Sequence, residues 1–278
     1  MIRKGGYIIT KYRPNSLQLL FTVSRNMSQS IQPTVERQEE LSQNYQSVLQ
    51  HVNSLTQEYN VKTPVTLVAV SKLKPSSDIQ ALYNAGVRHF GENYVQELIS
   101  KSKELPQDIK WHFIGGLQSG KAKDLAKGVK SLYAVETIDA LKKVKQLDRV
   151  RGEINGLPIN VYLQINTSEE DQKSGFSISD LNELYETLEF IISDECKNVN
   201  LIGLMTIGSF AQSTAEGEDN QDFKKLVELK QNLDKKYAIN LGLSMGMSSD
   251  YAQAIKQGST NVRVGTSIFG ARPPRNTT

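Results

Sequence analysis

Short apolar runs alternate with amphipathic helical patterns from residue 65 to residue 265. Short runs that are rich in β-branched and aromatic side chains are typical of buried strands. The segments between them repeat apolar residues every three or four positions, and several begin at Ser, Thr or Asp and end at Gly or Asn, as helix caps require. The apolar runs occupy residues 65–70, 87–91, 110–115, 131–135, 159–166, 199–205, 240–245 and 261–265.

Eight strands that alternate with helices predict an α/β fold, a single (β/α)8 or TIM barrel. An open, doubly wound sheet is the alternative, because it shows the same alternation of strands and helices. A further amphipathic helix is predicted before the first strand, over residues 35–59. We therefore expect a barrel domain over residues 35–273, between an N-terminal extension, residues 1–34, and a frayed tail, residues 274–278.

The composition argues against several other classes of protein. The net charge is +3 and the lysines are spread along the chain, so we expect no nucleic-acid partner. No apolar run is long enough to cross a membrane. The single cysteine, Cys196, cannot form an intramolecular disulfide, and it has no second Cys or paired His with which to bind zinc. The scattered histidines, His51, His89 and His112, do not predict a metal site either.

Two segments differ from the rest of the chain in composition. The chain has basic but no acidic side chains before Glu36, and this segment also carries an apolar, serine-containing patch, as mitochondrial transit peptides do. A disordered extension without a targeting role is the alternative, and an internal start at Met27 would give a cytosolic product. We therefore expect a cytoplasmic or mitochondrial location, or both. The acidic stretch over residues 211–222 predicts a mobile loop.

A lysine, Lys72, follows the first predicted strand, "TLVAV". In (β/α)8 barrels the active site lies at the carboxyl ends of the strands. The amine of Lys72 is therefore expected to point into the mouth of the barrel, although a lysine on a surface loop is the alternative. Lys74, next to Pro75 in the same turn, is expected to be solvated.

Two glycine-containing loops follow the last two predicted strands, in "LSMGMSSD" and "VRVGTSIFG". These are the loops that bind phosphate in many (β/α)8 barrels. Gly246 and Gly265 would let backbone N–H groups approach an anion, and Ser244 and Thr266 offer hydroxyl donors. The alternative is that both glycines only serve tight turns. The coincidence of two such loops predicts a phosphate site.

The segment "GGLQSGKAK" nearly matches a nucleotide-binding P-loop, because Gly115 and Gly120 are followed by Lys121. The next residue is Ala122, however, which has no hydroxyl for magnesium, and no strand-ending Asp follows as a second metal ligand. Lys121 is therefore expected on the surface, or as a distant anion contact at the barrel mouth.

Two polar residues near predicted strand ends have ordinary structural interpretations. Asn93, in "FGENYVQE", is expected to cap the next helix, and its amide could at the same time face a ligand. His112, inside "KWHFIG", is expected to be a hydrogen-bonded core residue rather than a base.

Seven motifs resemble those of the pyridoxal phosphate homeostasis protein family, in the same order and spacing. The resemblance is to the fungal branch in particular, and it covers about Val65 to Pro273, leaving residues 1–34 outside. It implies a barrel similar to the N-terminal domain of fold-type III enzymes such as alanine racemase, with pyridoxal 5′-phosphate (PLP) as cofactor. The motifs are "VAVSKLKP", "GVRHFGENYVQE", "WHFIGGLQSGK", "NTSEEDQKSGF", "GLMTIG", "LSMGMSSDYAQAI" and "VRVGTSIFGARP".

The resemblance also implies a role for individual residues. Lys72 would form an imine with the C4′ aldehyde of PLP. Arg263 would face the pyridine nitrogen and Asn93 would lie near the ring. The phosphate would be held by a set that agrees with the two loops singled out above: Ser244, Gly246, Gly265 and Thr266.

An arginine at the pyridine nitrogen weakens the cofactor as an electron sink, because arginine donates hydrogen bonds and cannot accept a proton. Racemases of this fold take a second base from an added domain, for which the chain leaves no room after the last strand. The resemblance therefore implies a monomeric carrier or regulator in vitamin B6 homeostasis, without strong turnover, whose partners are PLP, amines, amino acids and apo-PLP enzymes. A weak racemase or lyase, and a barrel for another phosphorylated metabolite, are the alternatives.

Overall fold

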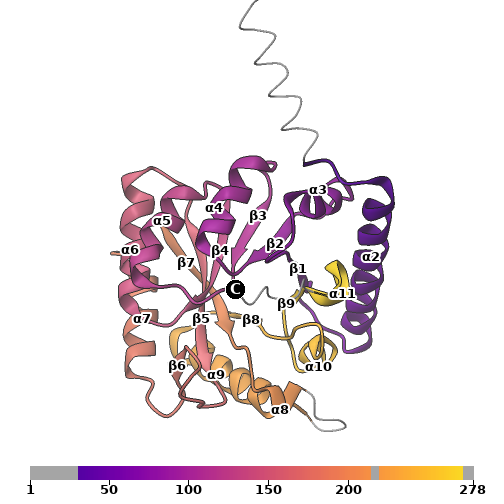
Figure 1. The fold of residues 1–278 in the computed structure, drawn as a ribbon. Coiled ribbons are helices and arrows are strands. Elements are labelled where there is room, and N and C mark those ends of the chain that lie inside the picture. The colour runs from indigo at the N-terminus through magenta and orange to yellow at the C-terminus, as the bar shows by residue number, and fades with distance from the viewer. Residues whose placement is uncertain (1–30, 214–218, 272–278) are drawn as a thin grey trace, which may run out of the picture.

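The computed structural model describes residues 31–213 and 219–271. Parallel strands lie at its centre and helices surround them (Figure 1). The strands are β1 (Thr66–Val70), β2 (His89–Glu92), β3 (Lys110–Phe113), β4 (Leu132–Ile138), β5 (Ile159–Asn166), β6 (Phe176–Ser177), β7 (Val199–Met205), β8 (Gly242–Ser244) and β9 (Asn261–Val264). The helices are α2 (Val35–Glu58), α3 (Ser76–Asn84), α4 (Val95–Glu104), α5 (Ser119–Gly128), α6 (Leu141–Glu153), α7 (Asn182–Ile192), α8 (Phe210–Ser213), α9 (Gln221–Tyr237), α10 (Tyr251–Lys256) and α11 (Thr266–Phe269).

The sheet closes on itself. Its order is β4-β3-β2-β1-β9-β8-β7-β5-β6, and β4 also pairs with β5. All strands but the short β6 therefore form a ring, and all the pairings are parallel. The prediction of a (β/α)8 barrel is confirmed. The alternative of an open sheet is wrong, because the pairing of β4 with β5 closes the ring.

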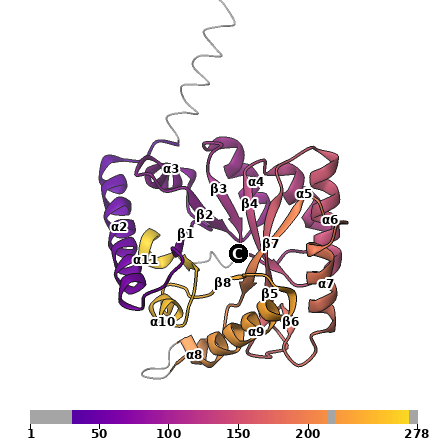
Figure 2. The ribbon, with the colours of Figure 1, turned by 180° about the vertical axis from the view of Figure 1, so that it is seen from behind.

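The main hydrophobic core lies between the ring of strands and the surrounding helices, which are seen from behind in Figure 2. Outward-facing strand residues such as Phe90 and Trp111 are fully buried there, with ring centroids 6.0 Å apart. Helix residues such as Leu98 and Leu125 are fully buried in the same core. Strands that are covered on one face by helices and on the other by the barrel interior carry near-continuous apolar runs, which is why the sequence pattern identified them.

The interior of the barrel is polar at its centre. Glu136 on β4 accepts hydrogen bonds from Ser244 on β8, at 2.6 Å, and from Asn261 on β9, at 3.1 Å. β4 is separated from β9 by three strands in the ring order, so these bonds cross the interior. All three side chains are buried. Hydrogen bonds offset the cost of removing such groups from water, and they hold opposite sides of the ring together.

The predicted N-terminal helix is present as α2, capped by Thr34, whose side chain accepts from the N–H of Arg37. It packs beside α3, α10 and α11 (Figures 1 and 2). Arg37 donates to Asp78 of α3, at 2.7 Å, and to the carbonyl of Phe269 in α11, at 3.0 Å. The helix thereby supports the loop region that follows β9.

Several expectations fail at loops. The short strand β6 was not predicted; it pairs with the end of β5. The loop expected over residues 211–222 is wrong at both ends, because α8 continues to Ser213 and α9 begins at Gln221. Asn220 caps α9 by accepting from the N–H groups of Asp222 and Phe223. The extension over residues 1–30, the loop centre at 214–218 and the tail at 274–278 lie outside the described residues. In the part of the chain that is described, no helix is both long and apolar enough to span a membrane.

Candidate functional site

A cavity of about 410 Å³ opens at the carboxyl ends of the strands. Its lining comes from strands β1, β7 and β9 and from the segments that follow β1, β2, β3, β7, β8 and β9, so distant parts of the sequence meet there. This is where (β/α)8 barrels place their active sites. The lining residues are Val70, Lys72, Lys74, Asn93, Ile114, Met205, Ile207, Met247, Ser248, Ser249, Arg263, Gly265, Thr266 and Gly270.

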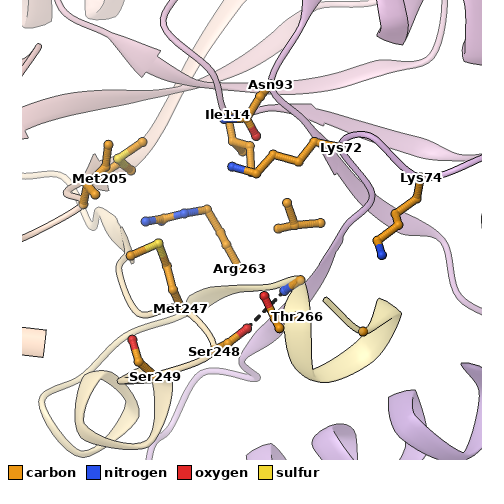
Figure 3. Close-up of a pocket in the computed structure, with 14 residues that line it drawn as sticks. Lys72, Lys74, Asn93, Ile114, Met205, Met247, Ser248, Ser249, Arg263 and Thr266 are labelled. Carbon is orange, nitrogen blue, oxygen red and sulfur yellow. Dashed lines mark hydrogen bonds between the residues drawn. The ribbon is translucent and has the colours of Figure 1, made fainter. Parts of the chain in front are cut away.

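The two lysines that follow β1 point in different directions. Lys72 is half-buried and its amine points into the cavity (Figure 3), as the sequence predicts. The ammonium of Lys74 turns away and donates to the carbonyls of Phe269, at 3.1 Å, and Ala271, at 2.8 Å. The expectation that Lys74 is simply solvated is therefore wrong: it also holds the end of α11. Lys72 is the lysine whose amine faces the cavity.

The side chain of Arg263 runs along the cavity between Lys72 and the loop that follows β8 (Figure 3). It is buried, and its guanidinium donates to the carbonyl of Thr206, at 2.9 Å, and to the hydroxyl of Ser244. Burial lowers the pKa of Arg263, and the charge of Glu136 opposes that effect. Burial also works against ionisation of Glu136, but the hydrogen bond from His112 and the charges of His112 and Arg263 hold the pKa of Glu136 below its ordinary value. Arg263 and Glu136 thus form a charged pair beneath the cavity.

On the side opposite Lys72, the loops that follow β8 and β9 supply hydroxyl groups (Figure 3). Ser249 and Thr266 are exposed, and Ser248 accepts a hydrogen bond from the N–H of Gly265 at 3.3 Å, which ties the two loops together. A Cβ at Gly265 would lie 3.3 Å from the carbonyl oxygen of Val70, so glycine permits the close approach of β9 to β1. Two of the predicted phosphate residues, Gly265 and Thr266, therefore line the cavity.

The structure does not bring the other two predicted phosphate residues to the cavity. Ser244 is fully buried as the last residue of β8, and its hydroxyl donates to Glu136. Gly246 has a left-handed φ of +97°, and a Cβ there would lie 2.6 Å from that of Ala254. Gly246 therefore serves a tight turn against α10, the alternative that the sequence left open. Ser248 and Ser249, from the same loop, occupy the cavity wall instead.

Asn93 lines the cavity from the end of β2. The expectation that it caps the next helix is wrong, because α4 begins after Tyr94 and no side chain caps it. Its amide oxygen is buried and has no hydrogen-bond partner among the described residues. A Cβ at Gly115 would lie 2.0 Å from the backbone oxygen of Asn93, so β3 can approach β2 here only with glycine. A buried amide oxygen without a partner beside a cavity is an acceptor that a ligand could satisfy.

The described lining of the cavity contains three cationic side chains and no acidic one. The hydroxyls of Ser248, Ser249 and Thr266 and the amine of Lys72 lie on different sides of the same space. The cavity size is within the range of small-molecule sites. The arrangement therefore fits an anionic molecule that carries a group reactive toward a primary amine.

The remaining sequence predictions concern residues away from the cavity. His112 is a buried, hydrogen-bonded core residue as expected: its Nδ1 lies 2.6 Å from Glu136. No partner for His89 or His51 is evident from the sequence alone, but in the structure His89 lies 2.8 Å from His112, and His51 lies 2.7 Å from the hydroxyl of Tyr251. Burial lowers the pKa of His89 to about 3, so it stays neutral.

Lys121 and Cys196 also lie away from the cavity. Lys121 of the near P-loop segment lies on the surface, 3.3 Å from Asp124. Cys196 is a half-buried free thiol, and burial raises its pKa to about 11. The described residues contain no cluster of His, Cys, Asp and Glu side chains that could hold a metal ion.

Comparison with known proteins identifies the class of this barrel. The family described as "Alanine racemase, N-terminal domain" matches residues 37–273. Alanine racemase from Clostridium difficile 630 in complex with cycloserine has the same fold, with a TM-score of 0.65 at 13% identity over 86% of this chain and 61% of that chain.

Two more similar proteins narrow the class. The "Pyridoxal phosphate homeostasis protein" of Schizosaccharomyces pombe is 49% identical over 209 residues, which are 75% of this chain and 85% of the relative. PipY of Synechococcus elongatus, solved with PLP bound, has a TM-score of 0.65 at 30% identity, over 83% of this chain and 100% of that chain. The chain belongs to the pyridoxal phosphate homeostasis protein family.

Proposed function

We propose that this protein binds PLP at the mouth of the barrel and acts as a carrier or regulator of PLP. The observation that carries the proposal is the arrangement of one cavity, with the amine of Lys72 on one side, hydroxyls of Ser248, Ser249 and Thr266 on the other, and Arg263 between them. PipY, solved with PLP bound, supports the choice of ligand.

Each side chain of the cavity has a distinct role in this proposal. The chemistry that the cofactor supplies is an aldehyde, which condenses reversibly with a primary amine and releases one water. Lys72 provides that amine. The hydroxyls and the backbone of the loops after β8 and β9 hold the phosphate, because hydroxyl and N–H donors in glycine-containing loops suit an anion. The amide of Asn93, whose oxygen has no partner among the described residues, orients the ring.

The chemistry of Arg263 favours storage of the cofactor over catalysis with it. A guanidinium next to the pyridine nitrogen can only donate, so that nitrogen accepts a hydrogen bond and stays unprotonated. An unprotonated ring stabilises a carbanion less well, which lowers any rate of proton removal from a bound amino acid. The described lining also supplies no carboxylate, imidazole or phenol beside Lys72 to remove such a proton. The proposal is therefore reversible storage, with release to amines, amino acids or apo-PLP enzymes, by a protein that works as a monomer.

The test is covalent labelling. Purified protein is mixed with PLP, the absorbance of the C=N link is recorded, and the link is reduced with borohydride and mapped by mass spectrometry. We expect the label on Lys72. Lys72→Ala should lose the absorbance while retaining part of the affinity for the phosphate, and Lys74→Ala should keep the link because its ammonium serves the end of α11. An unchanged absorbance in Lys72→Ala would disprove the assignment.

The alternative of a weak racemase or lyase is tested by its own reaction. A panel of amino acids is incubated with the PLP-loaded protein in deuterium oxide, and deuterium at the α-carbon is measured. A carrier should show no exchange above that of free PLP. Exchange that depends on Lys72 would identify an enzyme instead.

We also propose that residues 1–30, which lie outside the described residues, direct part of the protein to mitochondria, while a product that starts at Met27 stays in the cytoplasm. The basis is the basic, acid-free composition of this segment. A reporter fused to residues 1–30 should enter mitochondria, and a version in which the basic residues are replaced by serine should not. A reporter found only in the cytosol would disprove the proposal that residues 1–30 direct the protein to mitochondria.

A further inference from the structure

The turn that carries Lys72 has an unusual backbone. The N–H of Lys74 donates to the carbonyl of Ser71 at 3.0 Å, which closes a four-residue turn from Ser71 to Lys74. Leu73, at the third position, has a φ of +61°, whereas Lys72 is not among the residues with positive φ. This pattern is that of a type II turn, in which the third position is usually Gly or Asn. The left-handed conformation costs free energy at a leucine, so neighbouring groups must hold the turn in place.

Three charged side chains from β2 and α4 hold both neighbours of Lys72. The hydroxyl of Ser71 donates to Glu92 at 2.6 Å, and the ammonium of Lys101 donates to the carbonyl of Ser71 at 3.0 Å. The N–H of Leu73 donates to Glu97 at 2.8 Å. The peptide segments before and after Lys72 are therefore each tied to a charged side chain.

The three holding groups are also tied to one another. The ammonium of Lys101 lies 2.7 Å from Glu92 and 2.7 Å from Glu97. Glu92 is fully buried and Lys101 is 6% exposed, whereas Glu97 is partly exposed. A buried ion pair is a poor way to gain stability, because apolar residues of the same volume do as well or better. Its geometry is better explained by the position it gives to the turn.

We infer that Glu92, Lys101 and Glu97 are positioning residues that hold the Lys72 turn so that the amine of Lys72 faces the cavity. This inference rests on the proposed function, since it concerns the amine that forms the C=N link. None of the three residues lines the cavity, so they act through the backbone and do not touch the ligand.

The test separates the position of Lys72 from the integrity of the cavity. Two ligands are compared: PLP, which has the aldehyde, and pyridoxine 5′-phosphate, which has the same ring and phosphate but an alcohol in its place. The variants are Lys101→Met, which keeps the length of the side chain without the charge, and Glu97→Ala, which removes the partner of Leu73. Lys103→Met, an exposed lysine on the same helix, is the matched control.

We expect the rate of link formation with PLP to fall by about tenfold or more in Lys101→Met and Glu97→Ala, because displacement of a reacting group by about 1 Å can cost up to a hundredfold. Affinity for pyridoxine 5′-phosphate should stay within about twofold of the unmodified protein. Lys103→Met should leave both values unchanged. If Lys101→Met does not fold, Glu97→Ala carries the test alone, since Glu97 is partly exposed.

Two outcomes would overturn the inference. Link formation at the unmodified rate in the variants would show that the turn needs no such support. An equal loss in the rate of link formation with PLP and in the affinity for pyridoxine 5′-phosphate would show that the cluster maintains the whole cavity rather than the position of Lys72. Neither outcome contradicts the proposed function, which is disproved separately if Lys72→Ala still forms the link.

Discussion

Glu136 on β4 and Arg263 on β9 face each other across the interior of the barrel, with a carboxylate oxygen 3.8 Å from the guanidinium. Ser244 lies between them and bonds to both. His112 completes the set on the other oxygen of Glu136. The guanidinium at the base of the cavity is therefore held by Ser244, which bonds to Glu136 on another side of the ring, and by the carbonyl of Thr206, which directly follows β7.

The first prediction concerns the charge of Glu136. In Glu136→Gln the buried guanidinium loses its counter-charge, and the new amide N–H₂ group faces donors that previously bonded a carboxylate. We expect the free energy of unfolding to fall by about 3 kcal/mol, because removing one partner of a buried pair leaves the other charge uncompensated. Urea unfolding measures the change. Glu153→Gln, in an exposed pair with Arg149, is the control and should change stability by less than about 0.5 kcal/mol. A similar small loss in Glu136→Gln would contradict the prediction.

The second prediction uses two adjacent glycines. A Cβ at Gly115 would lie 2.0 Å from the backbone oxygen of Asn93, whereas nothing lies within 4 Å of a Cβ at Gly116. Gly115→Ala must therefore push β2 and β3 apart at the cavity, and we expect a loss of about 2 kcal/mol or more in the free energy of unfolding. Affinity for PLP should fall with it, because Asn93 lines the cavity. Gly116→Ala should match the unmodified protein in both measurements, and equal effects of the two substitutions would refute the steric argument.

The barrel could be predicted because each strand is enclosed between helices and the interior, which leaves a short apolar run in the sequence. The position of Lys72 followed from the same pattern, since it comes directly after the first run. Gly265 and Thr266 were predicted for a related reason, because Gly265 ends the last run and Thr266 follows it.

The parts that could not be predicted depend on which way a strand residue points. Ser244 was expected to offer its hydroxyl to a phosphate, but as the last residue of β8 it turns that hydroxyl into the interior, where it donates to Glu136. Successive side chains of a strand point to opposite faces, so an error of one residue reverses the direction expected for a side chain. Strand ends predicted from a sequence are uncertain by more than one residue. The hydrogen bonds of Glu136 could not be predicted either, because its partners Ser244 and Asn261 lie on strands that come to lie across the interior from β4 only when the ring closes. Ser248 lies in the same predicted loop, "LSMGMSSD", and it is the turn at Gly246 that brings Ser248 rather than Ser244 to the cavity.

The third prediction concerns the helix that precedes the barrel. Arg37 of α2 donates to both carboxylate oxygens of Asp78, which is 5% exposed, and to the carbonyl of Phe269. Arg37→Ala leaves a mostly buried carboxylate without this partner, so we expect a loss of about 2 kcal/mol in urea unfolding. Arg149→Ala, on the exposed face of α6, should cost much less. If α2 were a separate appendage, the two variants would behave alike.

The fourth prediction is a dependence of stability on pH that comes from Glu92. Burial raises the pKa of this carboxyl from 4.5 to about 7, against the lowering effect of Lys101 and of the hydroxyl of Ser71. Between pH 4.5 and about 7 the folded protein keeps the proton at this site while the unfolded chain releases it. The contribution of Glu92 to the free energy of unfolding therefore decreases as the pH rises through this window, by up to about 3 kcal/mol, and is constant above it.

The measurement is the difference in unfolding free energy between the unmodified protein and Glu92→Gln, recorded from pH 4 to pH 8 so that all other titrations cancel. We expect this difference to fall as the pH rises to about 7 and then to level off. Repeating the comparison in a Lys101→Met background should move the upper end of the window to higher pH, because the ammonium that favours the ionised carboxylate in the folded protein is gone. A difference that grows with pH would mean that Glu92 is ionised more readily in the folded protein than in the unfolded chain. The pair with Lys101 would then outweigh the burial of the carboxylate.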